Sequence, residues 1–172
     1  MDKSQYKNVY VFVEQRDGVV QNVALELLGK ARELADALHE QVIALLLGKG
    51  VKDKADELIA AGADVVLSIE ADELAQYTTE PYAQAITQVS HERKPSILLI
   101  GATSIGRDLG PRLSARIGTG LTADCTGLDI SEDGDLLMTR PAFGGSLMAT
   151  IICTDHRPQM STVRPGVMRA KA

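Results

Sequence analysis

The chain has 172 residues, of which 45% are hydrophobic, and its formal net charge is −5. This length and composition predict a single domain, spanning 1–172, with a sizeable core. The acidic balance argues against nucleic acid as a partner, and no apolar run approaches the ~20 residues that a membrane span needs. Because no leader segment precedes Tyr6, we expect a cytoplasmic protein.

Strand and helix patterns alternate over the first two thirds of the chain. A β-rich apolar run at 8–13 is followed by leucines at helical spacing over 23–38 and by a second apolar run at 41–47. The alternation predicts a three-layer α/β/α fold, Rossmann-like, with a mostly parallel sheet covered on both faces. The remaining expected elements are helices over 51–61, 81–93 and 106–117, and strands over 64–69 and 96–100.

The pattern changes after Gly118. Four short segments, at 124–130, 135–140, 147–154 and 159–164, are separated by turn residues. The pair Asp133-Gly134 is the strongest hairpin signal in the chain. We expect these segments to be antiparallel strands that either extend the main sheet or form a small separate one.

The turn after the strand at 96–100 is a candidate phosphate site. Thr103 or Ser104 is placed to cap a helix that carries Arg107 in its first turn, at the carboxyl edge of the sheet. However, a strand-to-helix turn needs glycine for its own geometry, and arginines at helical spacing also form solvated faces. Neither GxGxxG nor GxxxxGK[ST] occurs here, so both interpretations stay open.

Motifs for enzyme chemistry are missing from the sequence. No GxSxG, HExxH or CxxC occurs, so we assign no catalytic residue and expect no enzyme activity. Cys125 and Cys153 lie apart from each other and from the three histidines, which predicts core thiols and no metal site. Glu14, Arg16 and Asp17 follow the first strand and form either a polar site, a solvated loop or an interface.

Four segments in order carry a family resemblance. They are NVYVFVEQRDG at 8–18, GATSIGRDLGPRLSARIGTGLTADCTGLDI at 101–130, TRPAFGGSLMATI at 139–151 and STVRPGVM at 161–168. Together they resemble the α subunits of electron transfer flavoproteins over nearly the whole chain. The resemblance implies a nucleotide-hydrolase-like first domain, with the FAD-binding second domain of that family absent from this sequence.

The resemblance also implies a role in electron transport. Such α subunits form an αβ heterodimer that carries electrons between flavin dehydrogenases, such as acyl-CoA dehydrogenases, and an acceptor. This domain is then expected to support the dimer and to flank a nucleotide held mainly by the β subunit, either AMP or a second FAD. The main FAD site of the complex is expected outside this chain.

Arg140 is the side chain that we expect to contact a flavin. A guanidinium near the N5 side of the ring can donate a hydrogen bond and favour the anionic reduced form, and Pro141, Phe143 and Gly144 shape that contact. The alternative for Arg140 is an ion-paired surface arginine at a strand end. Two other functions remain open: an autonomous nucleotide-binding regulatory module that uses the turn at 103–107, or a purely structural assembly domain.

Overall fold

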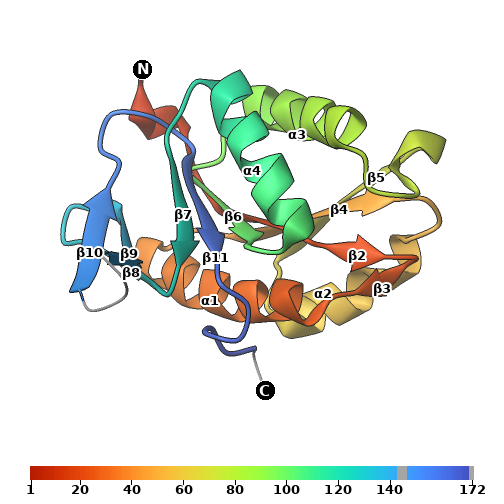
Figure 1. Cartoon of the computed structure of the whole chain (residues 1–172), viewed down its shortest axis with the longest axis horizontal. Coiled ribbons are helices and arrows are strands. Elements are labelled where there is room, and N and C mark those ends of the chain that lie inside the picture. The colour runs from red at the N-terminus through yellow and green to blue at the C-terminus, as the bar shows by residue number, and fades with distance from the viewer. Residues whose placement is uncertain (143–146, 171–172) are drawn as a thin grey trace.

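A six-stranded parallel sheet, with strand order β5-β4-β1-β6-β11-β7, forms the centre of the structure (Figure 1). The structure is a computed structural model that describes residues 1–142 and 147–170. Every neighbouring pair in this sheet is parallel. The strands are β1 (Val9–Phe12), β4 (Val42–Gly48), β5 (Val65–Glu70), β6 (Ile97–Gly101), β7 (Leu121–Cys125) and β11 (Gln159–Val163).

Alternating side chains of β1 point into two separate cores. Val9 and Val11 pack in one apolar cluster, whereas Tyr10 and Phe12 pack in the other. Successive side chains of a strand point to opposite faces, so a strand that is buried on both faces reads as a continuous apolar run. All four residues of β1 are buried accordingly.

Helices cover both faces of the sheet. Figure 1 shows α3 (Thr79–Arg93) and α4 (Ser104–Ile117) on one side and α1 (Asn22–Leu38) and α2 (Ala55–Ala61) on the other. The expected three-layer α/β/α fold is therefore confirmed. The described residues also include the short 3₁₀ helices η1 (Lys3–Gln5), η2 (Lys52–Lys54) and η3 (Asp72–Leu74). Of these, η2 forms the start of the helix expected at 51–61.

A separate antiparallel sheet packs beside α1. Its strands are β8 (Gly127–Ile130), β9 (Leu136–Ala142) and β10 (Leu147–Ile152), in the order β10-β9-β8. The hairpin predicted at Asp133-Gly134 joins β8 to β9, and Gly134 has the left-handed φ of 85° that such a turn requires. A two-stranded ribbon is formed by β2 (Gln15–Arg16) and β3 (Val19–Val20).

Two of the four segments expected to be antiparallel strands belong to the parallel sheet instead. The prediction for 159–164 is wrong, because β11 lies parallel between β6 and β7. The prediction for 124–130 is wrong in its first part, because β7 continues to Cys125. Both strands contain buried polar residues, such as Thr122 and Ser161, and this hides the apolar run that marks a central parallel strand.

Candidate functional site

The carboxyl ends of β1 and β6 lie next to each other at one edge of the sheet. From β1 the chain proceeds outward to β4 and β5, and it then returns to β6 on the other side of β1. This change of direction creates a topological switch point, where open α/β sheets bind ligands. The first turn of α4 begins at this point.

Thr103 caps α4, as the sequence predicted for this residue or Ser104. Its hydroxyl oxygen accepts a hydrogen bond from the N–H of Gly106 at 3.1 Å. A Cβ atom at Gly106 would lie 1.6 Å from the carbonyl oxygen of Gly101, so only glycine permits this close approach of helix and strand. Ser104 is exposed.

A buried carboxylate stands beside the start of α4. Glu14 follows β1, and its side chain is 3% exposed. The Thr103 hydroxyl donates to Glu14 Oε1 at 2.5 Å, and Arg16 Nη2 lies 3.3 Å from Oε2. Of the three interpretations for Glu14, Arg16 and Asp17, a solvated loop is therefore excluded for Glu14. The negative charge is favourable near the positive end of a helix dipole.

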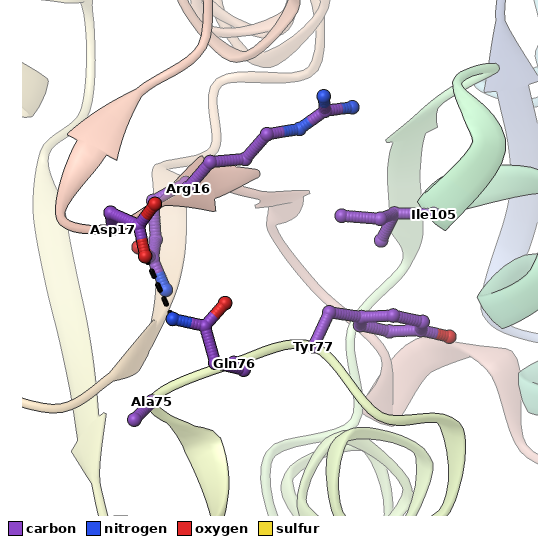
Figure 2. Close-up of a pocket in the computed structure, with 7 residues that line it drawn as sticks. Arg16, Asp17, Ala75, Gln76, Tyr77 and Ile105 are labelled. Carbon is purple, nitrogen blue, oxygen red and sulfur yellow. Dashed lines mark hydrogen bonds between the residues drawn. The ribbon is translucent and has the colours of Figure 1, made fainter.

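A pocket of about 310 Å³ opens at the same edge. Figure 2 shows Tyr77 and Ile105 on one side of it and Asp17 and Gln76 on the other, where the Gln76 amide donates to Asp17 at 2.7 Å. The pocket lies at the small end of typical ligand cavities. Its lining comes from the segments that follow β1, β5 and β6: Gln15, Arg16, Asp17, Ala75, Gln76, Tyr77 and Ile105.

Tyr77 also connects this pocket to α4. Its hydroxyl donates to Asp108 Oδ2 at 2.7 Å, and the hydroxyl of Thr79 donates to the same oxygen at 2.5 Å. These hydrogen bonds from Thr79 and Tyr77 lower the pKa of Asp108. Burial, together with the nearby Asp108, raises the pKa of Tyr77, which is therefore a neutral donor at physiological pH.

A second polar group lies on the other flank of α4, around Asp124 near the end of β7. Arg164 directly follows β11 and donates to both carboxylate oxygens of Asp124, from Nε at 3.3 Å and from Nη2 at 2.8 Å. Arg107 Nη2 lies 4.0 Å from Asp124 Oδ1. The hydrogen bond from Arg164, followed by the charges of Arg164, Arg107 and Arg140, lowers the pKa of Asp124.

Arg140 lies on β9, opposite Ala149 of β10. Its neighbour Thr139 accepts a hydrogen bond from the N–H of Thr126 at 2.8 Å, which holds β9 against the chain segment after β7. The Nε atom of Arg140 is buried and has no hydrogen-bond partner among the described residues. Pro141 is partly buried next to it. The predicted site residues Phe143 and Gly144 lie outside the described residues.

Asp124 was not predicted as a site residue. Arg107 Nη2 lies 4.0 Å from its carboxylate, and the charges of Arg107 and Arg140 contribute to its lowered pKa. Asp124 and Arg164 were missed because Asp124 lies one residue before the end of β7 and Arg164 directly follows β11, and both strands were expected to be antiparallel. Had 121–125 and 159–163 been recognised as parallel strands, both residues would have fallen at the carboxyl edge.

The cysteines differ in environment. Cys125 is buried, and this burial raises the pKa of its thiol, as expected for a core residue. Cys153 is only partly buried. Among the described residues, no group of three or more His, Cys, Asp or Glu side chains is arranged to hold a metal ion. Within residues 1–142 and 147–170, no helix combines the length and apolar character that a membrane span requires.

Comparison with known families gives a match over nearly the whole chain. The family described as the electron transfer flavoprotein domain matches residues 9–172. The match includes the turn that begins α4, the Asp124 group and Arg140.

Individual relatives agree with this match. The chain is 58% identical over 168 residues to the electron transfer flavoprotein subunit alpha of Clostridium acetobutylicum, covering 97% of this chain and 50% of that protein. It is 48% identical to the acryloyl-CoA reductase electron transfer subunit beta of Anaerotignum propionicum, covering 98% and 52%. It is 46% identical to subunit LctC of the NAD(+),ferredoxin lactate dehydrogenase of Acetobacterium woodii, covering 99% and 41%. The chain thus spans about half the length of these relatives.

Proposed function

The chain belongs to the electron transfer flavoprotein domain family, and from that premise we propose that it works as one half of an αβ electron carrier. In this proposal the domain corresponds to the first domain of an α subunit. It supports assembly with a β subunit and flanks the nucleotide or flavin of that subunit. The complete complex carries electrons from flavin dehydrogenases, such as acyl-CoA dehydrogenases, to an acceptor.

The observation that carries the assembly role is the exposed apolar surface of β10. Leu147 and Met148 are each 58% exposed, Ile152 is 45% exposed and Ile151 is 37% exposed. Ile151 and Ile152 also line a groove of about 360 Å³ between β10 and β7. Successive side chains of a strand point to opposite faces, so Met148 and Ile152 lie on one face of β10 and Leu147 and Ile151 on the other. Exposed apolar side chains gathered on one strand in this way indicate an interaction site in a folded protein.

The position of β10 strengthens this interpretation. It is an edge strand of the three-stranded sheet, so one row of its backbone groups has no strand partner among the described residues. Edge strands are usually protected by charged side chains or proline. The sequence LMATII of β10 contains neither. A protein partner that covers this strand removes the apolar side chains from water and satisfies the free backbone groups.

The side chain of Arg140 has the hydrogen-bond donors and the positive charge that suit contact with a flavin. The buried Nε–H has no acceptor among the described residues, and an unsatisfied buried donor costs free energy unless a ligand completes it. A flavin supplies electron transfer, and its reduced ring gains negative charge. In the proposed role, Arg140 donates a hydrogen bond to that ring and stabilises the charge. Pro141 restricts the backbone beside it.

The two alternative functions have less support. An autonomous nucleotide-binding module would place a phosphate at the switch point, where the Glu14 carboxylate already lies beside the start of α4. The negative charge of this carboxylate would repel the phosphate of a bound nucleotide. A purely structural domain explains the exposed apolar side chains of β10. It does not explain why the buried Nε–H of Arg140 has no acceptor among the described residues.

Calorimetry separates the three functions. The purified chain is titrated with AMP, ATP and FAD, first alone and then in complex with its β subunit. The proposed function predicts tight nucleotide or flavin binding only when the β subunit is present. Tight binding by the chain alone supports the autonomous module, and no binding in either case supports the structural domain.

A further inference from the structure

We propose that Arg107 and Arg164, oriented by Asp124, form a seat for a phosphate-type oxyanion at the carboxyl ends of β7 and β11. The inference rests on the proposed function in that it assigns a ligand class to the nucleotide-facing edge of the domain. It nevertheless concerns contacts made by this chain itself, so it can be tested without a flavin or a partner.

Asp124 fixes the guanidinium of Arg164 in one orientation. Two nitrogen atoms of Arg164 point to the two carboxylate oxygens, at 2.8 and 3.3 Å. The backbone is held as well, because the N–H of Arg164 donates to the carbonyl of Cys125 at 2.9 Å. Because both the guanidinium and the backbone N–H of Arg164 are held by hydrogen bonds, the side chain is preorganised. Preorganisation lowers the entropic cost of binding a ligand.

The backbone of Asp124 adopts a conformation that few side chains tolerate. Its φ is 59°, in the left-handed region, and the pairing of β7 with β11 changes register between Ser161 and Val163. The N–H of Asp124 donates to the hydroxyl of Thr162 at 2.9 Å, which stabilises this conformation. Such backbone strain gathers at functional sites, where a side chain must point in a particular direction.

The group has more positive charge than its own carboxylate can neutralise. Arg107 is 65% exposed, and its 4.0 Å approach to Asp124 is too long for a hydrogen bond. Its guanidinium has no hydrogen-bond partner among the described residues. Two guanidinium groups therefore face one carboxylate. The excess charge and the free N–H groups both call for an anion.

Phosphate suits this arrangement better than a carboxylate does. A phosphate compensates the excess of positive charge, and its oxygens accept hydrogen bonds from Arg107 and from those N–H groups of Arg164 that do not donate to Asp124. Arg107 also lies in the first turn of α4, where the helix dipole favours negative charge. The opposite flank of α4 is occupied by Glu14, so an anion approaches from the side of Asp124.

The test is a titration of the 172-residue chain with inorganic phosphate, pyrophosphate and AMP, followed by amide chemical shifts. We expect saturable binding with a Kd on the order of 1 mM for phosphate. Shifts should centre on Arg107 and Asp124. Arg164→Lys keeps the charge but loses both the paired contact with Asp124 and the planar set of N–H donors, and we expect it to weaken binding at least about fivefold. Arg112→Lys is the matched control, because Arg112 lies on α4 but pairs with Glu80, and its affinity should stay unchanged.

Each outcome has a definite meaning. Equal affinity of the Arg164→Lys variant and the wild type would show a diffuse basic surface and overturn the seat, as would the lack of saturable binding. Similar affinities for phosphate and AMP indicate that the phosphate group alone is recognised, which supports the seat. If AMP binds more than a hundredfold tighter than phosphate, the seat stands, but the proposed division of labour between two subunits fails.

Discussion

The hydroxyl group of Thr103 donates a hydrogen bond to the buried carboxylate of Glu14 at 2.5 Å. The same hydroxyl oxygen caps α4 by accepting from the N–H of Gly106. One side chain therefore connects the end of β1 to the start of α4 across the switch point of the sheet. Residues on the two sides of this connection have different surroundings, since Glu14 is buried and Arg107 is exposed.

We expect Thr103→Val to destabilise the domain by about 2 kcal/mol, because it removes a helix cap and leaves a buried carboxylate with one donor fewer. Thr103→Ser retains the hydroxyl and should stay within about 0.5 kcal/mol of the wild type. Urea unfolding measures both free energies. Equal stability of the Val and Ser variants would contradict the role given to this hydroxyl.

Charges on β10 should disrupt assembly without unfolding the domain. The double substitution Met148→Lys and Ile152→Lys changes two exposed side chains, so the free energy of unfolding should change by less than about 1 kcal/mol. Binding to the β subunit should weaken at least about tenfold. Ile59→Lys on α2 is the control, because Ile59 is also 50% exposed. If the β10 variant binds as well as the control, β10 is not the assembly surface.

The Asp124 group predicts a pH dependence of stability. The pKa of Asp124 in the folded state is lowered, chiefly by Arg164, so its ionised form stabilises the fold. This stabilisation is complete above the ordinary aspartate pKa of about 3.9 and is lost as the pH falls through the lower folded-state value. Asn tolerates the same backbone conformation, so Asp124→Asn isolates the charge.

Denaturant unfolding between neutral and acidic pH measures this effect. The advantage of the wild type over Asp124→Asn should be present at pH 7 and should shrink as the solution becomes strongly acidic. An advantage that grows on acidification would have the opposite sign and would rule out the depressed pKa.

Substitution of Arg140 should change flavin electrochemistry. In the complete αβ complex, Arg140→Ala removes a positive charge from the proposed flavin contact, so the potential of the adjacent flavin should become more negative. Arg112 pairs with Glu80 on the exposed surface, so Arg112→Ala should leave the flavin potential unaltered. Spectroelectrochemical titration compares the two. An unchanged potential in the Arg140 variant rejects the contact.

Local sequence signals predicted the α/β part of the fold well. The leucines of α1 and the apolar runs of β1, β4 and β6 each combine a clear periodicity with turn residues at their ends, and the structure has them within a few residues of the expected bounds. Thr103 was recognisable for the same reason, since an N-cap is specified within one turn of its own helix.

The path of β11 was not predictable from such local signals. Its sequence QMSTV contains buried polar residues that are satisfied by distant partners: the Gln159 amide donates to Ser96 and accepts from the N–H of Leu136 at 2.7 Å. The strand also returns to the parallel sheet only after the β8, β9 and β10 excursion. Long-range pairing of this kind leaves no periodic pattern in the sequence. The contact between Asp124 and Arg164 was therefore not predictable.

The most direct test of the central claim is the visible absorption spectrum of the purified chain, recorded alone and together with its β subunit. If the domain is a scaffold that completes a cofactor site only in a heterodimer, the chain alone is colourless, and flavin absorption appears only in a preparation that contains the partner. A stoichiometric flavin spectrum from the 172-residue chain by itself would contradict the account.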